Sequence, residues 1–131
     1  MKINLKNQKV PFKIKQLKYF DYRGYFQEIF LNKNFCLNIK FTAIAKSKQN
    51  VIRGLHFQKK NQQTKLIHVT EGKILDVVIN LKKNSKHFGK VSKFILNEGD
   101  ILFIPKFYAH GYECLSKKCT ILYHLEKYRD V

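Results

Sequence analysis

The segment from residue 65 to residue 79 limits the possible folds of this chain more than any other. Two runs of β-prone residues, 65–70 and 73–79, lie on either side of Glu71-Gly72. A glycine at the centre of such a pattern is typical of a tight turn, because glycine adopts positive φ angles without steric cost. The pattern therefore predicts a β-hairpin whose turn is Glu71-Gly72.

Two charged residues within this predicted hairpin are unusual. If the turn has two residues, Ile67 lies opposite Asp76, and Lys65 shares the face of Ile67, diagonal to Asp76. A lysine and an aspartate on an otherwise apolar inner face are costly to bury unless they pair or serve a functional site. We therefore expect Asp76 to serve as the partner of Lys65.

The rest of the chain also favours strands. The segment 7–20 has a weakly helical pattern, but Pro11 and the alternating lysines argue against a helix. Short β-prone runs that are separated by turn residues are typical of a sandwich or a barrel. We predict an all-β fold, with further strands at residues 38–45, 90–96, 100–104 and 119–125.

The net positive charge of the chain is large, but it says less about the partners of the chain than its magnitude suggests. The net charge is +17, but the basic residues spread from Lys2 to Lys127 and only three of them are arginines. Surfaces that read nucleic-acid phosphates favour the planar fork of arginine. We therefore do not expect a nucleic-acid partner, and we interpret most of the lysines as a solvated surface. A small anion such as a nucleotide diphosphate needs only a few of them.

Nothing in the sequence divides the chain into parts. With 44% hydrophobic residues and no repeat or linker, residues 1–131 are expected to form a single domain.

Cys36, Cys114 and Cys119 are odd in number and form no C-x-x-C pair, so we expect free buried thiols and neither a disulfide nor a zinc site. No apolar stretch is long enough to span a membrane, which predicts a cytoplasmic protein without a membrane partner.

The dipeptides Arg23-Gly24 and Arg53-Gly54 are candidates for binding an anion. Glycine lets the backbone approach an oxyanion while the neighbouring guanidinium grips it with two hydrogen bonds, although both dipeptides can also be ordinary turns. His56 follows the second dipeptide within a β-prone run. A histidine at this place is either a base in an electropositive pocket or a structural histidine with its hydrogen bonds satisfied.

A second group of residues is similar to a motif of the cupins. Gly99, Pro105 and His110 have the spacing at which a strand of a small jelly-roll barrel ends beside a histidine that lines the barrel mouth. Counted back from Gly72, Lys65 takes the position at which metal-binding cupins have a glutamate ligand. An ammonium group there disfavours a metal ion. The resemblance implies a cupin-type jelly-roll barrel or sandwich without a metal.

Beyond the fold, the chain resembles the dTDP-4-dehydrorhamnose 3,5-epimerases. The core signature of that family is similar to residues 53–58, 63–66 and 71–77 in order and spacing. The resemblance extends upstream and downstream, at residues 21–30, 85–89, 104–112 and 122–123.

This resemblance implies an isomerase that inverts C3, C5 or both in a nucleotide-diphosphate 4-keto-6-deoxy sugar for surface-polysaccharide synthesis. A hydrogen next to a ketone is weakly acidic, so the reaction needs a base, a cation for the enolate and an acid on the opposite face. In the family these roles belong to the positions of His56, Lys65 and Tyr123. The resemblance also implies a homodimer, no cofactor and no metal.

The resemblance further implies a set of substrate-binding residues. Arg23 and Arg53 match positions that hold the diphosphate and orient the sugar, and His110 matches a histidine that lines the cup. From the residues alone, Phe26 can equally be core, Glu28 a surface ion-pair partner, His110 a turn cap and Tyr123 structural. The full set of expected substrate-binding residues is Arg23, Phe26, Glu28, Arg53, Gln58, His110 and Tyr128.

The chain departs from the family pattern in three places. It ends at Val131, ahead of the C-terminal segment that carries the aspartate partner of the catalytic histidine, and Asp76 is the nearest internal substitute. Residues 41–46 are less polar than in the family, and Arg129 replaces the second of two tyrosines. Alternatives are therefore a single-site epimerase, a keto-sugar isomerase, or a non-catalytic module that binds a nucleotide sugar.

Overall fold

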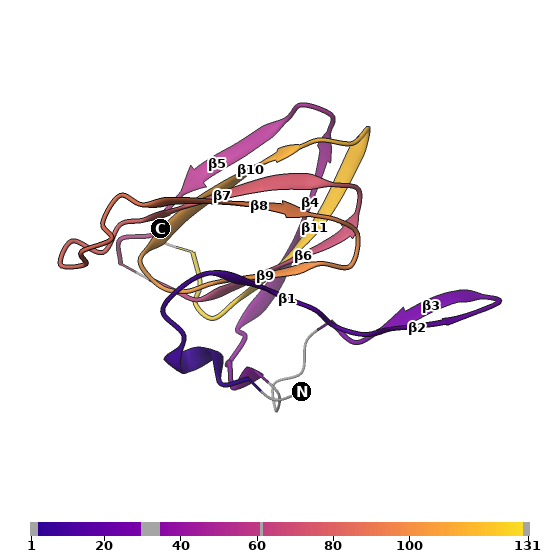
Figure 1. Cartoon of the computed structure of the whole chain (residues 1–131), viewed down its shortest axis with the longest axis horizontal. Helices are drawn as coiled ribbons and strands as arrows, with labels where there is room; N and C mark the ends of the chain where they lie inside the picture. Colours follow the sequence, from indigo (N-terminus) through magenta and orange to yellow (C-terminus); the bar gives the residue numbers. More distant parts are fainter. Residues whose placement is uncertain (1–2, 30–34, 61, 130–131) are drawn as a thin grey trace.

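Two antiparallel β-sheets face each other in the computed structural model, which describes residues 3–29, 35–60 and 62–129 (Figure 1). Phe30, the last residue of the family-like opening segment, lies outside the described residues. The first sheet has the order β1-β9-β6-β11-β4, and the second has the order β5-β10-β7-β8. Every pair of neighbouring strands is antiparallel. The prediction of an all-β fold is confirmed.

The strands of the first sheet are β1 (Phe12–Ile14), β9 (Ile101–Ile104), β6 (Lys65–Glu71), β11 (Lys118–Leu125) and β4 (Phe41–Lys48). Those of the second sheet are β5 (Ile52–His56), β10 (Tyr108–Cys114), β7 (Ile74–Asn80) and β8 (Val91–Leu96). A short 3-10 helix, η1 (Leu5–Asn7), precedes β1. The four further strands predicted from the sequence correspond to β4, β8, β9 and β11, whereas β5, β10 and the strands before residue 38 were not predicted.

The predicted hairpin over residues 65–79 is wrong. β6 pairs with β9 and β11, and β7 pairs with β10 and β8, so the two strands lie in different sheets. The turn between them contains Gly72 at φ +87°, where an added Cβ would clash with the Lys118 carbonyl oxygen. The turn is tight as predicted, but it carries the chain across the interior. Alternating apolar residues cannot distinguish these two cases, because both place the same side chains inward.

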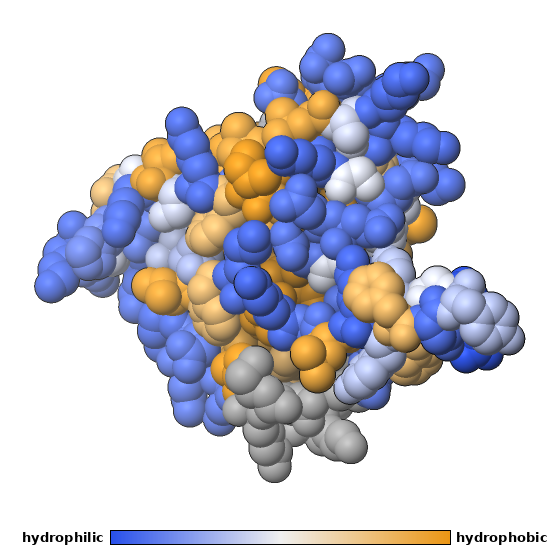
Figure 2. Space-filling view, turned by 45° about the vertical axis from the view of Figure 1, so that its right-hand side comes forward, coloured by the Kyte–Doolittle hydropathy of each residue, from blue (hydrophilic) through white to orange (hydrophobic). Residues whose placement is uncertain are grey.

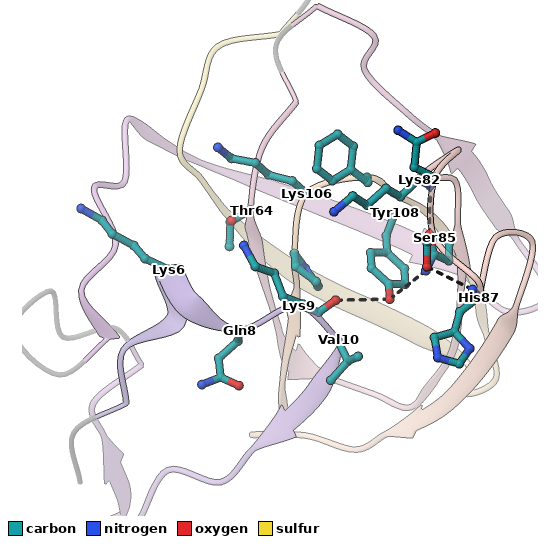
Figure 3. Close-up of a pocket in the computed structure, with 14 residues that line it drawn as sticks. Lys6, Gln8, Lys9, Val10, Thr64, Lys82, Ser85, His87, Lys106 and Tyr108 are labelled. Carbon is teal, nitrogen blue, oxygen red and sulfur yellow. Dashed lines mark hydrogen bonds between the residues drawn. The ribbon is translucent and has the colours of Figure 1, made fainter.

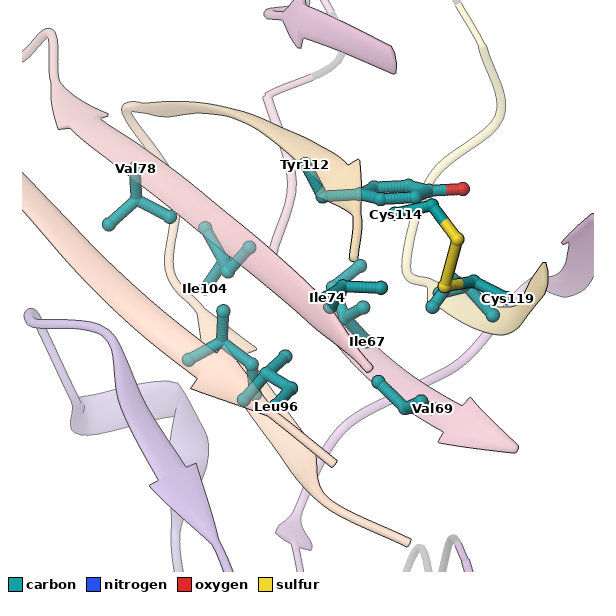
Figure 4. Close-up of a cluster of buried hydrophobic side chains, with 11 residues drawn as sticks. Ile67, Val69, Ile74, Val78, Leu96, Ile104, Tyr112, Cys114 and Cys119 are labelled. Atoms are coloured by element: carbon teal, nitrogen blue, oxygen red, sulfur yellow. A yellow bond between two sulfur atoms is a disulfide. The ribbon is translucent and has the colours of Figure 1, made fainter. Parts of the chain in front are cut away.

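Buried side chains, most of them aliphatic, fill part of the space between the sheets (Figure 4). Ile67 and Val69 of β6 meet Ile74 and Val78 of β7 in this core, and all four are fully buried. A second apolar cluster lies on the other face of the first sheet, where it includes Leu66 and Phe103 together with residues of the N-terminal region. Both faces of β6 are therefore covered, which explains why its first five residues are all buried.

Cys114 and Cys119 form a disulfide (Figure 4), which corrects the expectation of free thiols. The chain crosses from the second sheet to the first between β10 and β11, and both cysteines point into the core from the strand ends. Their Cα atoms are 5.9 Å apart, within the range that a disulfide bridges. Sequence spacing alone does not indicate this geometry.

A two-stranded hairpin, β2 (Lys18–Asp21) and β3 (Gly24–Gln27), projects from the body of the molecule (Figure 1). We call residues 18–27 the hairpin arm. It exposes aromatic side chains, with Phe20 72% and Phe26 65% exposed. Figure 2 shows the arm at the right, and hydrophilic side chains over most of the rest of that face. Among the residues described, no helix is both long and apolar enough to cross a bilayer.

Candidate active site

A cavity of about 530 Å³ lies between the two sheets. We call it the His56 cavity. One wall comes from β4, β6 and β11 of the first sheet, and the other from β5 and β10 of the second. A cavity of this size is typical of a site for a small molecule.

Strand register places the predicted reactive side chains inside this cavity. In the first sheet, Tyr123 pairs with the core residue Ile67, and Lys65 pairs with Leu125. Directly paired residues share a face of the sheet, so Lys65 and Tyr123 both face inward. In the second sheet, His56 pairs with the inward-facing His110. His56, Lys65, His110 and Tyr123 all line the His56 cavity, and so does Leu125.

A close approach of two glycines brings β5 against β10 beside His56. A Cβ on Gly54 would lie 2.7 Å from the Gly111 Cα atom, and one on Gly111 would lie 2.7 Å from the Arg53 carbonyl oxygen. Both distances are too short for any larger residue. The glycine of Arg53-Gly54 is therefore needed for strand packing, whereas the sequence pattern suggested that it admits an oxyanion.

Arg53 is fixed on the wall of the His56 cavity by two hydrogen bonds. Its Nε donates to the Ser47 hydroxyl at 2.8 Å, and its Nη2 donates to the Lys46 carbonyl oxygen at 2.8 Å. Ser47 in turn lies 3.1 Å from the Tyr112 hydroxyl. A guanidinium held in this way is preorganised to meet an anion in the cavity.

Burial and nearby cations lower the pKa of His56. Desolvation is the largest cause, followed by the charges of His110 and Lys65 and then by those of two arginines. The neutral imidazole, which accepts a proton, is therefore the favoured form at neutral pH. Burial also lowers the pKa of Lys65, which is 9% exposed, while the Asp76 carboxylate opposes that change.

Asp76 is hydrogen-bonded to His110, which corrects the expectation that it is the direct partner of Lys65. The His110 Nδ1 atom lies 3.3 Å from the Asp76 Oδ2 atom, and both side chains are buried. Burial raises the pKa of Asp76, and His110 and Lys65 oppose this. The expectation failed because it assumed a hairpin, whereas Asp76 pairs with Tyr112 of β10. The carboxylate orients the His110 ring, and it influences Lys65 only through its charge.

Tyr123 is held as a phenol. Its pKa is raised, mainly by burial and also by a hydrogen bond with Tyr112 and the charges of Tyr112 and Asp76. Its ring packs against His110 with centroids 6.2 Å apart. A tyrosine in this environment keeps its proton until a stronger base forms next to it.

The other predicted substrate-binding residues fall into two groups. Gln58 lines the His56 cavity, and Tyr128 lies at its edge, where it stacks on Phe41 at a centroid distance of 5.9 Å. Arg23, Phe26 and Glu28 lie on or directly after the hairpin arm and line no part of this cavity. Instead, the exposed Arg23 side chain forms an ion pair with Asp21 at 2.6 Å.

Sequence reasoning missed several residues of the cavity. Phe41, Ala43 and Ala45 line it from alternate positions of β4, and Arg129 lines it from the end of the described chain. The alternation of these three residues is a signal for an inward face, but the sequence does not show that the face borders a cavity. Among the described residues, no three or more His, Cys, Asp or Glu side chains gather in a way that could hold a metal ion.

Comparison with known proteins decides the family. The family model described as dTDP-4-dehydrorhamnose 3,5-epimerase matches residues 9–130. The chain belongs to this family. It is 40% identical over 121 residues to the epimerase of Methanothermobacter thermautotrophicus, a match that covers 82% of this chain and 65% of that protein. It is 36% identical over 121 residues to the Escherichia coli epimerase, covering 81% and 65%. The chain thus spans less than two thirds of the length of these relatives.

Solved structures of a dTDP-6-deoxy-D-glucose-3,5-epimerase and of a dTDP-4-dehydrorhamnose 3,5-epimerase have the same fold. The Legionella pneumophila enzyme, solved in complex with dTDP-4-keto-L-rhamnose, matches with a TM-score of 0.87 and 30% identity, covering 92% of this chain and 68% of that one. The Sulfolobus tokodaii enzyme matches with a TM-score of 0.85 and 34% identity, covering 92% and 72%. The predicted family and the cupin-type fold are confirmed.

Proposed function

We propose that the chain is a nucleotide-sugar epimerase that inverts C3, C5 or both in a dTDP-linked 4-keto-6-deoxy sugar. The observation that carries this proposal is the position of His56, Lys65 and Tyr123 around one cavity. Family membership supports it, and so does the solved complex of the Legionella pneumophila relative with dTDP-4-keto-L-rhamnose. Arg53 and Arg129 add positive charge for the diphosphate.

The proposed reaction consists of two proton transfers. Neutral His56 removes the proton from a carbon next to the C4 ketone, and the bonding electrons move to the ketone oxygen. The Lys65 ammonium stabilises the resulting enolate oxygen. Tyr123 then donates its phenolic proton to the opposite face of the same carbon, and His56 loses the captured proton to water as Tyr123 regains one. No redox step is involved.

Hydrogen exchange in heavy water tests this proposal. We expect the protein to introduce deuterium at C3, C5 or both when it is incubated with a dTDP-linked 4-keto-6-deoxy sugar, as followed by NMR of the sugar. His56→Ala is expected to lose exchange by about 100-fold or more, because its base is gone. Lys93→Ala, an exposed change on β8, serves as the control that keeps exchange.

Two outcomes of this experiment contradict the proposal. Binding of the sugar nucleotide without exchange at either carbon would identify a non-catalytic binding module. Substantial exchange by His56→Ala would reject His56 as the base, while leaving epimerase activity in place.

We also propose that residues 1–131 form one cupin domain and that two copies form a homodimer in which the hairpin arm of each completes the cavity of the other. The arm supports this, because Arg23 and Phe26 lie away from the cavity of their own chain and Phe26 is 65% exposed. An exposed aromatic arm of this kind is typical of an association surface.

Mixing two inactive variants tests the exchange of arms. His56→Ala and Arg23→Ala are each expected to be nearly inactive. On co-expression, about half of the dimers would be hybrids, and each hybrid would contain one site with both residues intact. About a quarter of the wild-type activity should therefore return. No recovery in hybrids of dimer mass, as measured by sedimentation, would show that each arm serves its own chain.

A further inference from the structure

A second cavity, of about 510 Å³, lies outside the proposed active site (Figure 3). We call it the lysine cavity, because Lys6, Lys9, Lys82 and Lys106 line it. These lysines come from three parts of the chain, namely η1 with the residues after it, the loop after β7 and the turn after β9. Of the described residues that line this cavity, none is acidic.

The lysine cavity and the His56 cavity share a thin wall. Thr64 lines the lysine cavity, whereas its neighbours Gln63 and Lys65 line the His56 cavity. This wall is tied to the turn after β9, because the Phe107 amide donates a hydrogen bond to the side-chain oxygen of Gln62 at 3.1 Å. The two cavities share no lining residue, although residues of both, including Lys65 and Phe107, border a small space next to them.

The floor of the lysine cavity is made of buried polar groups. Thr64 is 6% exposed and Asn80 is 7% exposed, and both line the cavity. The Asn80 side-chain oxygen accepts from the Lys82 amide at 2.9 Å, while its amide nitrogen makes only long contacts of 3.5 Å with the hydroxyls of Ser85 and Tyr108. Buried polar groups in a cavity that four lysines also line suit a ligand with many acceptor oxygens.

The loop that carries Lys82 is built to a fixed shape. Backbone hydrogen bonds run from Ser85 to Lys82, from Phe88 to Ser85 and from Gly89 to Asn80. The Lys82 ammonium lies 5.5 Å from the centre of the Phe107 ring, over its face. Phe107 itself has a positive φ of 73°, which a residue with a side chain adopts only where its surroundings impose it. The backbone that carries Lys82 is thus fixed, and the Lys82 ammonium lies against the Phe107 ring.

We propose that the lysine cavity binds a diphosphate group, either as free diphosphate or as part of a nucleoside diphosphate. Lysine ammonium groups are compact charges that suit phosphate oxygens, and several of them are needed to match the charge of a diphosphate. The volume is in the range of small-molecule sites. The cavity continues into a neighbouring space of about 300 Å³ that adds Lys90 and Ser92, which leaves room for a nucleoside. This site is separate from the proposed reaction.

An NMR titration of the full chain with sodium pyrophosphate tests this proposal. We expect saturable shifts of the amide signals of Thr64, Lys82 and Phe107. The double variant Lys82→Gln/Lys106→Gln should bind about tenfold more weakly, because charged hydrogen bonds to the phosphates are lost. The matched control is Lys93→Gln, which removes the same charge from an exposed position on β8 and should bind as the wild type does.

Three results would overturn the site. They are shifts confined to Arg53 and His56, shifts that do not saturate, and an equal loss of affinity in the Lys93→Gln control, which would indicate diffuse attraction to a chain of charge +17. Titration with ADP distinguishes the two sources of diphosphate. Tighter binding of ADP than of pyrophosphate, with larger shifts at Phe107, assigns the cavity to a nucleoside diphosphate, and equal affinity assigns it to the diphosphate alone.

Discussion

Three histidines of this chain show how strongly the role of one residue type depends on its surroundings. His56 lies at the wall of a cavity among cations, which favours its neutral form. His110 is oriented by a buried carboxylate. His68 is buried between the first sheet and the N-terminal region, and neither of its ring nitrogens has a hydrogen-bond partner among the described residues. Only the first two face a cavity.

Burial of His68 should make the stability of the fold depend on pH. Its pKa is lowered from 6.5 to about 4, chiefly by desolvation. Because the folded-state pKa lies below the unfolded value, the unfolded chain takes up the proton first, and stability is lost as the pH falls from 6.5 toward 4. The free energy of unfolding should be about 2 kcal/mol lower at pH 5 than at pH 7 through this residue.

Urea unfolding of His68→Leu at both pH values measures this contribution. The variant should lose the part of the drop that His68 contributes, because leucine is neutral at any pH and fits the apolar surroundings, while the lowered pKa values of His56 and His124 leave a remaining drop. His87→Leu, a change of an exposed histidine, should keep the drop of the wild type. An unchanged drop in His68→Leu would assign the pH dependence to other groups.

At the level of strands, the sequence carries more information about which residues face inward than about which strands are neighbours in a sheet. The alternation in β4, β7 and β11 was sufficient to predict strands there. It could not reveal that β6 and β7 lie in different sheets, because a turn within a sheet and a turn between sheets require the same inward side chains. The partner of Asp76 depends on that difference, so His110 could not be assigned to it.

The residues of the site were predictable where a motif carried them. His56, Lys65 and Tyr123 were named from a resemblance, and the structure brings them to one cavity. The apolar lining from Phe41, Ala43 and Ala45 was not predictable, since apolar inward residues of an edge strand look the same in a sequence whether they border a core or a cavity. Whether the hairpin arm serves its own chain or another is also a question of association, on which a single sequence carries no pattern.

The contact between β5 and β10 predicts the effect of a single methyl group. In Gly111→Ala the added Cβ would lie 2.7 Å from the Arg53 carbonyl oxygen, so β5 must move away and take His56 with it. We expect the free energy of unfolding to fall by about 1–3 kcal/mol. Hydrogen exchange into the sugar should fall as well, while Lys93→Ala leaves both unchanged. Wild-type stability and exchange in Gly111→Ala would show that the strands adjust without cost.

For the molecule as a whole, two features matter, namely the positive charge of the chain and the disulfide that links the two sheets. The cations of the two cavities lie within a chain of net charge +17, so anions are attracted before they reach either site. The disulfide joins the two sheets at the far side of the core, where Cys114 of β10 meets Cys119 of β11. It closes a small loop, for which chain-entropy arguments give a modest stabilisation.

Counting thiols tests that linkage. The unfolded, unreduced protein should show one reactive thiol, Cys36, and three after reduction. In urea unfolding, the free energy of unfolding of Cys114→Ser/Cys119→Ser should be about 2 kcal/mol lower than that of the wild type, because the loop constraint is lost. Three reactive thiols without reductant in protein purified under air would show that the bond does not form.

The row of small side chains along β4 bears on how such a protein changes during evolution. Ala43 and Ala45 occupy one wall of the His56 cavity, while the groups proposed to move protons stand on other strands. Ala43 pairs directly with Tyr123. Because β4 is at the edge of its sheet and Ala45 pairs with Ile121 instead, a larger residue at position 45 would reshape the cavity without pressing on the Tyr123 phenol. In the proposed epimerase, a substitution at position 45 would thus alter the choice of sugar while the groups that move protons stay in place.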